Sequence, residues 1–173
     1  MNFVQTTRDD HRVAWFTALA ITIHIAESAL PSPLPGIKPG LANVITVVVL
    51  MRFGWRLAAW VNLLRVFAGS LLIGTFLSPT FILSLSGALA STVTLVLLSQ
   101  LPNRGCGAVG YSVASAMVHT FAQFLVAYHL FIQHEGLFRL LPLLMTAALI
   151  FGVISGLVTI ILLEHLKQYE LTH

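Results

Sequence analysis

Charged residues are scarce in this chain of 173 residues, because only 9% are Asp, Glu, Lys or Arg. A soluble globular domain carries about 25% charged residues, so the charges are too few to cover a solvated surface. Hydrophobic residues, in contrast, make up 57% of the chain. This combination excludes a soluble domain and a disordered chain, and it predicts a membrane protein with several spanning helices.

Several familiar sites and motifs are also missing. The single cysteine, Cys106, excludes an internal disulfide and a cysteine-built metal site. The seven histidines are dispersed without close ligand spacing, so we expect no metal and no cofactor. The sequence has no phosphate-binding loop, no HExxH and no GxSxG, which gives no active site for bond-making chemistry. The basic residues are scattered between hydrophobic runs, so a nucleic-acid partner is not expected.

Hydrophobic runs separated by charges, prolines and glycines predict an all-α integral membrane protein with a bundle of six transmembrane helices. The predicted spans cover residues 13–30, 41–53, 57–77, 81–98, 107–132 and 140–163. They form a transmembrane domain over residues 13–166, between tails of residues 1–12 and 167–173. The second span is shorter than the roughly 20 residues that a bilayer needs. Either its helix starts back at Pro39, or the preceding connector dips into the membrane.

The distribution of basic residues predicts the orientation. Most of them fall at the termini and in the even-numbered loops, namely Arg8, Arg12, Arg52, Arg56, Arg104 and Lys167. Only Lys38 and Arg139 fall in odd-numbered loops. Positive charge marks the cytoplasmic side, so we expect both termini in the cytoplasm and the connector over residues 31–40 outside.

Arg65 lies near the middle of the third predicted span. A charged side chain at the bilayer centre costs about 2.5–3.5 kcal/mol on insertion scales, so Arg65 should face the bundle interior and find a partner there. Two interpretations stay open. Arg65 forms a structural ion pair with Glu27, or it holds an anionic or carbonyl-bearing ligand through its directed N–H donors.

Three polar residues near the predicted outer ends of the first two spans are further candidates. Glu27 is either solvated, paired with Arg65, or in contact with a ligand. Lys38 and Asn43 flank the start of the second span, where free N–H groups and the helix dipole attract anions. The alternative for Lys38 is an interfacial lysine that reaches up to water. His24 is expected to be an interior helix contact.

A further polar zone is predicted by residues that share a helix face. His119 and Gln123 are four positions apart on the fifth span, and Asn62 and Arg65 are three apart on the third. The alternative is plain interhelical hydrogen bonding, worth about 0.6 kcal/mol in membranes. We predict a substrate-binding lining made of Glu27, Lys38, Asn43, Arg65, His119 and Gln123.

Small residues four positions apart allow helix backbones to approach closely. Three such pairs are present: Ala14 with Ala18, Gly87 with Ser91, and Gly152 with Gly156. We expect most of them to pack helices within the bundle, although any one of them could instead dock a partner subunit.

Several stretches resemble a known family. They are ESALP at residues 27–31, LPGIKPGLAN at 34–43, NLLRV at 62–66, GSLLIGTFLSP at 69–79, LSGA at 85–88 and HTFAQ at 119–123. Over residues 18–163 the chain resembles the Gx transporter family, which is often described as heptaprenyl diphosphate synthase component I. That family resembles the S components of energy-coupling factor transporters, which are small six-helix membrane proteins that bind a vitamin-like compound from outside.

The resemblance implies a function, a gate and a docking face. The chain would capture a small solute, which can be anionic, for import with a transmembrane coupling subunit and its ATPases in a bacterial cytoplasmic membrane. Ala14 and Ala18 would contact the coupling subunit. The connector would close over the ligand as a gating loop through Pro31, Pro33, Pro35, Gly36 and Gly40.

Two alternatives to transport stay open. The chain lacks the aspartate-rich motifs of prenyl diphosphate synthases. An enzyme name would therefore make it a non-catalytic membrane component I of a heptaprenyl diphosphate synthase, which serves isoprenoid and quinone side-chain synthesis. The remaining alternative is a structural scaffold in a membrane redox or quinone-related complex.

Overall fold

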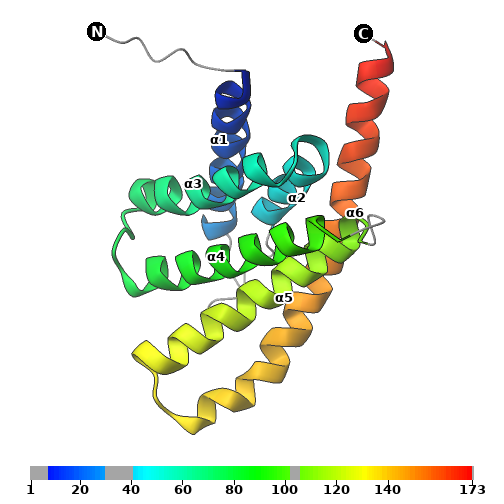
Figure 1. Ribbon diagram of the computed structural model, residues 1–173. Helices are drawn as coiled ribbons and strands as arrows, with labels where there is room; N and C mark the ends of the chain where they lie inside the picture. The colour runs from blue at the N-terminus through cyan, green and yellow to red at the C-terminus, as the bar shows by residue number, and fades with distance from the viewer. Residues whose placement is uncertain (1–7, 30–40, 102–105, 173) are drawn as a thin grey trace, which may run out of the picture.

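The computed structural model describes residues 8–29, 41–101 and 106–172, and the regular structure within those ranges is helical, with no strand. In chain order the elements are α1 (Arg8–Ala29), α2 (Leu41–Phe53), α3 (Trp55–Ile73), α4 (Pro79–Ser99), α5 (Ala108–Val126), the π-helical turn η2 (Ala127–Phe131), the 3₁₀ helix η3 (Glu135–Leu140) and α6 (Leu141–Thr172). Figure 1 shows α3 beside α4, α1 crossing behind α3, and α5 packed along α6. The all-α prediction is confirmed for these residues.

Four of the described helical segments are long and apolar enough to cross a membrane. They are Trp55–Ile73, Pro79–Ser99, Ala108–Phe131 and Glu135–Gln168. The remaining two helices do not meet this criterion. α1 begins with a strongly charged turn, and α2 has only 13 residues, or about 20 Å at 1.5 Å per residue. Six helices were predicted, and the residues that the structure describes form six α-helices, but membrane crossing by α1 and α2 stays a prediction.

The short helix α2 lies in the centre of the bundle. Every residue from 44 to 50 is buried, so the helix is covered on all sides, as expected for a helix that is hydrophobic all round. Its neighbours are α1, α3, α5 and α6. Because protein surrounds α2, its backbone ends can be satisfied without spanning the full hydrocarbon thickness.

The turn between α3 and α4 is set by one glycine, one serine and one proline. Gly74 adopts φ 77° at the end of α3, a left-handed conformation that glycine reaches without steric cost. Ser78 caps α4 by accepting a hydrogen bond from the Phe81 amide at 3.3 Å, and Pro79 occupies the first turn. The predicted third span, which continued to residue 77, was therefore too long at this end.

The glycine pair at Gly152 and Gly156 packs α6 directly against the backbone of α5. A Cβ at Gly152 would lie 2.9 Å from Val113 Cα, and one at Gly156 would lie 2.5 Å from Val109 Cα. No side chain larger than hydrogen fits at those distances. The expected close approach through this pair is confirmed.

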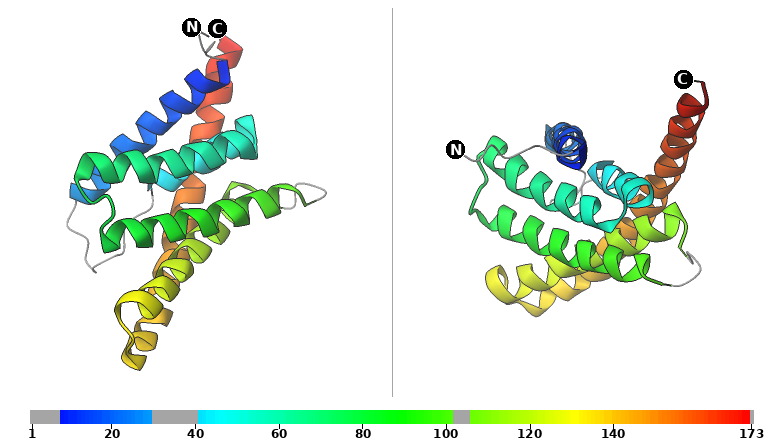
Figure 2. Two further views of the ribbon diagram at one scale, coloured as in Figure 1. Left: turned by 60° about the vertical axis from the view of Figure 1, so that its left-hand side comes forward. Right: turned by 45° about the horizontal axis from the view of Figure 1, so that its top comes forward.

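Successive turns lie at opposite ends of the bundle. The α2–α3 junction and the end of α4 lie on the right in Figure 1, whereas the α3–α4 turn and the end of α5 lie on the left. The start of α1 and the end of α6 point to the same side of the molecule (Figures 1 and 2). Which side faces the cytoplasm stays a prediction.

Candidate functional site

A buried polar pair on α3 forms the centre of the candidate site. Arg65 is 7% exposed and Asn62 is 0% exposed. Arg65 Nη2 donates to Asn62 Oδ1 at 2.7 Å, one helical turn away. The expectation that Arg65 turns into the bundle interior is confirmed.

Asn62 also joins α3 to α4. Its Nδ2 donates to the Ala88 carbonyl at 3.2 Å and to Thr92 Oγ1 at 2.9 Å, and it lies 3.4 Å from Ser91 Oγ. The amide oxygen is used by the guanidinium and the amide nitrogen by α4, so the side chain has one orientation in this network. Asn62 therefore positions the guanidinium of Arg65 relative to α4.

His119 of α5 completes the cluster from the other side. Its ring packs against Gly87 of α4 so closely that a Cβ at Gly87 would lie 2.6 Å from His119 Nε2. Gly87 directly precedes Ala88, whose carbonyl accepts the hydrogen bond from Asn62, so the His119 ring lies beside the Asn62 network. His24 in turn packs on α3, where a Cβ at Gly69 would lie 3.3 Å from its Cδ2. Three helices, α1, α3 and α5, thus contribute to one polar cluster, which we define as His24, Asn62, Arg65 and His119.

A cavity of about 90 Å³ lies next to this cluster, between α1, α3 and α4. It is lined by His24, Val66, Ser70, Ile73, Thr75, Thr80, Phe81 and Ser84. Val66, Ser70 and Ile73 share one face of α3 and lead from the Arg65 level toward the α3–α4 turn. Since ligand pockets for drug-sized molecules run to about 300 Å³ or more, the cavity suits a single small polar group or a few water molecules.

The cavity offers hydroxyl groups to a ligand. Ser70 Oγ already donates to the Phe67 carbonyl at 2.8 Å. The hydroxyls of Thr75, Thr80 and Ser84 make no side-chain hydrogen bond with any other residue that the structure describes. Hydroxyl groups both donate and accept hydrogen bonds, so they can bind oxygen atoms of an anion or of a neutral polar solute.

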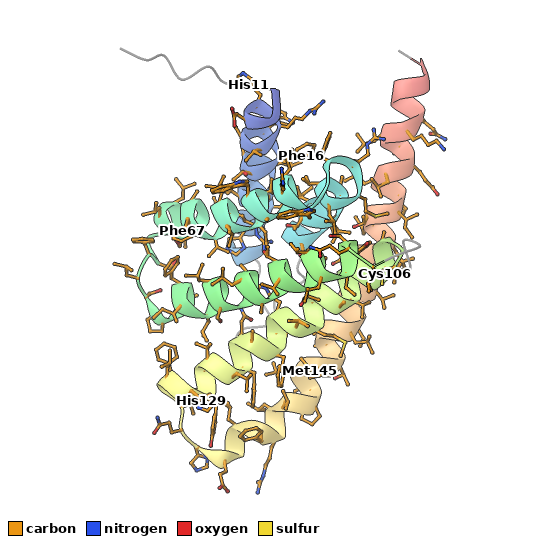
Figure 3. The ribbon with its side chains drawn as sticks, viewed as in Figure 1. His11, Phe16, Phe67, Cys106, His129 and Met145 are labelled. Atoms are coloured by element: carbon orange, nitrogen blue, oxygen red, sulfur yellow. The ribbon has the colours of Figure 1, made fainter. Side chains whose placement is uncertain are left out.

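Aromatic rings gather beside the cavity near the α3–α4 turn. Phe81, one of the lining residues, packs edge-on against Phe67 with 5.6 Å between ring centroids and against Phe76 with 4.9 Å. Figure 3 shows Phe67 at the α3–α4 end of the bundle. Phe81 therefore forms an apolar part of the cavity wall beside the hydroxyl-bearing residues.

The remaining predicted site residues are not all brought together. Asn43 Nδ2 donates to Ser115 Oγ at 2.6 Å and so joins α2 to α5, one turn before His119 on α5. Gln123 is partly exposed and makes no side-chain hydrogen bond among the described residues. The Glu27 side chain, Lys38 and the predicted gating loop over residues 31–40 lie outside what the structure describes. Ala14 and Ala18, the predicted docking residues, are exposed.

The hydroxyl lining of the cavity was missed from the sequence. Thr80, Ser84, Gly87 and Ser91 recur every three or four residues on α4, which places them on one face. That spacing was a usable signal, but serine and threonine are common in membrane helices and often bond to their own backbone, as Ser91 does to the Ala88 carbonyl at 3.1 Å.

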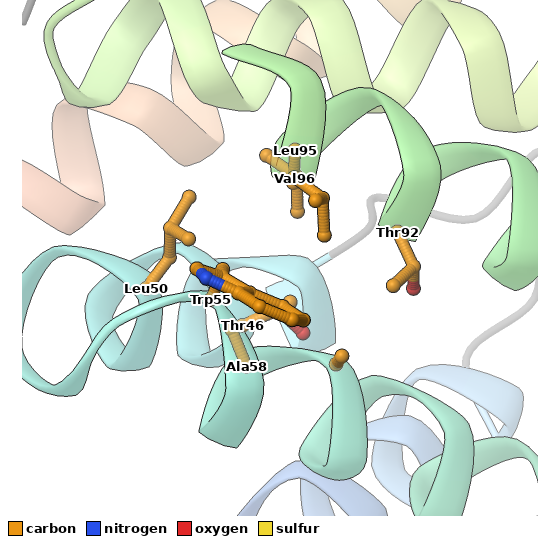
Figure 4. Close-up of a pocket in the computed structure, with 8 residues that line it drawn as sticks. Thr46, Leu50, Trp55, Ala58, Thr92, Leu95 and Val96 are labelled. Atoms are coloured by element: carbon orange, nitrogen blue, oxygen red, sulfur yellow. The ribbon is translucent and has the colours of Figure 1, made fainter. Parts of the chain in front are cut away.

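A second indentation lies at the opposite end of α4 and is apolar. Figure 4 shows Trp55 of α3 facing Leu95 and Val96 of α4. Its free volume is too small for a water molecule. In addition, no group of three His, Cys, Asp or Glu side chains suited to a metal ion is found in residues 8–29, 41–101 and 106–172.

Comparison with known proteins identifies a family. A family model described as heptaprenyl diphosphate synthase component I matches residues 16–162, which include the whole polar cluster and the cavity. The search of curated proteins gave no match, and the search of solved structures gave none either. The match confirms the family resemblance seen in the sequence. It also confirms the expected enzyme description, because the family is described as component I of the synthase.

Proposed function

We propose a function from one premise: this chain belongs to the family described as heptaprenyl diphosphate synthase component I. The chain is a membrane subunit that binds a small solute, which can be anionic, between α1, α3 and α4. It hands the solute to an energy-coupled import system in a bacterial cytoplasmic membrane, with both termini in the cytoplasm. A transmembrane coupling subunit would contact the exposed face of α1 that carries Ala14 and Ala18.

One observation carries this proposal: a small hydroxyl-lined cavity adjoins the polar cluster with its buried Arg65, inside an apolar bundle. A bilayer protein that only needs to pack gains little from interior hydroxyls and a guanidinium, because charge at this depth costs several kcal/mol. A ligand with oxygen atoms gives those groups a common use. Thr75, Thr80 and Ser84 supply hydrogen bonds, and Arg65 supplies positive charge one turn deeper.

The position of the cavity also favours capture from outside. It lies at the α3–α4 end of the bundle, near the end of α1 that carries His24. The positive-inside distribution of Lys and Arg predicts that this end faces away from the cytoplasm. A solute arriving from outside would therefore meet the hydroxyl groups first and the polar cluster second.

The size of the cavity limits what enters it. About 90 Å³ holds a small solute or the polar head of a larger one. The two imidazoles that pack at Gly69 and Gly87, those of His24 and His119, add ring nitrogen atoms to the polar cluster. The combination suits a carboxylate, a phosphate or a polar carbonyl group.

Native mass spectrometry of the detergent-purified protein tests this proposal. We expect a bound small molecule that is retained by the wild type and lost from the double variant Thr80→Val and Ser84→Ala, which removes two hydroxyls and leaves the charges in place. Arg139→Gln serves as the control, because Arg139 is exposed in η3 and far along the chain from the cavity. A wild-type protein that carries no small molecule, or a double variant that retains it as well as the control, would contradict the proposal.

The family name favours a second candidate function. As a non-catalytic component, the chain would bind the diphosphate of an isoprenoid substrate or product for a separate catalytic subunit. Prenyl transfer by a candidate catalytic subunit should then require this chain. Such a requirement would overturn the import function, whereas catalysis that is indifferent to the chain would exclude the second candidate.

A further inference from the structure

Arginine and aromatic side chains gather at the α2–α3 end of the bundle, far from the cavity. Arg52 lies in the last turn of α2, and Arg56 lies in the first turn of α3. Between them Gly54, at φ 91°, turns the chain. Arg12 reaches this turn from α1, because its Cζ lies 5.0 Å from the centroid of the Phe53 ring. We define Arg12, Arg52 and Arg56 as the arginine corner.

Aromatic rings hold the corner in shape. Arg56 Cζ lies 5.4 Å from the centroid of the Trp55 ring, and Phe53 packs against Phe16 of α1 at 5.4 Å. Figure 3 shows Phe16 close to the α2–α3 junction. A guanidinium held against an aromatic ring is less mobile, so it loses less freedom when it binds an oxygen ligand.

The corner lies where a membrane surface is expected. Trp55 is 41% exposed and begins α3, which is one of the helices apolar enough to cross a bilayer. Trp15 on α1 is 74% exposed. Tryptophan prefers the headgroup level of a bilayer. Along the chain, one carboxylate whose side chain the structure describes, that of Asp10, lies within two residues of these arginines, so the arginines outnumber it.

We infer that the arginine corner binds the phosphate groups of anionic phospholipids. Two of its guanidiniums, Arg12 and Arg56, are exposed, and they come from different helices. Arginine pairs with phosphate through parallel hydrogen bonds. Each basic residue at a membrane surface contributes about 1 kcal/mol of attraction to anionic lipid. One lipid headgroup would thereby link α1 to the α2–α3 junction.

Tryptophan quenching tests this inference in vesicles. Trp15→Phe and Trp60→Phe leave Trp55 as the remaining tryptophan, beside the corner. In vesicles of equal brominated-lipid content, brominated phosphatidylglycerol should quench Trp55 more strongly than brominated phosphatidylcholine. Because the brominated lipid occupies both leaflets, the readout does not depend on the orientation of the reconstituted protein.

Variants of the corner then assign the effect. Arg12→Gln with Arg56→Gln should lower the relative association constant for the anionic lipid by roughly 25-fold, from about fivefold per arginine. Arg12→Lys with Arg56→Lys should retain most of the preference, because the charges remain. Arg139→Gln, at the other end of the bundle, should retain all of it. Equal quenching by both lipids, an unaffected glutamine variant, or an equal loss in Arg139→Gln would overturn the inference.

Discussion

Replacing Gly156 with alanine adds a methyl group where α6 touches the backbone of α5. The added Cβ would lie 2.5 Å from Val109 Cα and 3.1 Å from Val109 Cβ. Non-bonded carbon atoms prefer about 3.5–4.0 Å, so the two helices must separate by about 1 Å at this point. A backbone atom cannot rotate away as a side-chain tip can, so the separation has to move one whole helix against the other.

The expected destabilisation follows from that displacement. Overpacking a tight interface costs about 1–3 kcal/mol. For a chain of this length each kcal/mol lowers the Tm by about 2–4 °C. We expect Gly156→Ala to lower the Tm by roughly 2–12 °C, measured by the helical circular dichroism signal of the protein in a mild detergent.

Gly107→Ala is the matched control for this experiment. Gly107 precedes α5 with φ −72°, which any residue adopts, and nothing lies within 4 Å of a Cβ built there. Its Tm should equal that of the wild type or exceed it slightly. If Gly156→Ala had the same Tm as Gly107→Ala, the added methyl group would be tolerated at the helix contact. The reasoning that α5 and α6 are in backbone contact would then be refuted.

Three other outcomes are expected. Asn62→Leu removes the amide that holds Arg65 and joins α3 to α4, so the free energy of unfolding should fall by about 1–3 kcal/mol in a denaturant titration. Gly87→Ala pushes the His119 ring away, since the added Cβ would lie 2.6 Å from Nε2; binding of the small molecule expected in the native mass spectrum should weaken by roughly fivefold, the equivalent of about one hydrogen bond. Cys106, beside the start of α5, should react with an impermeant maleimide only from the cytoplasmic side.

Each of these outcomes has a control. Gln100→Leu, an exposed position after α4, should leave the free energy of unfolding unchanged, and an equal effect in both variants would argue against the network at Asn62. Gly107→Ala should bind the solute as the wild type does. Labelling of Cys106 from outside would reverse the predicted orientation.

The sequence was informative about properties that are encoded along the helix axis. The all-α class, the residues of α2, the burial of Arg65 and the glycine pair that packs α6 on α5 were all predicted correctly. Hydropathy, helix-ending glycines and small-residue spacing are local signals, so they can be read without knowing which helix neighbours which. The end of α3 was misplaced because the residues after Gly74 are also apolar, and hydropathy alone does not detect a left-handed turn.

The site depended on contacts between distant segments. Asn43 makes a hydrogen bond with Ser115, 72 positions away, rather than joining the polar cluster. His24 lines a cavity with Thr80 and Ser84, although each residue looks like an ordinary helix position by itself. A helix face presents several polar side chains, and only the neighbouring helix decides which of them are bonded and which are left facing a cavity.

By itself, the sequence determined that this chain is an apolar helical bundle with a few buried polar groups, because scarce charge and long hydrophobic runs leave no other stable environment. The tertiary structure alone decided that His24, Asn62, Arg65 and His119 gather in one cluster and that serine and threonine residues line the adjoining cavity. The physical reason is that hydrophobic burial is non-directional and follows from composition. Hydrogen bonds and close backbone contacts require particular helix faces to meet.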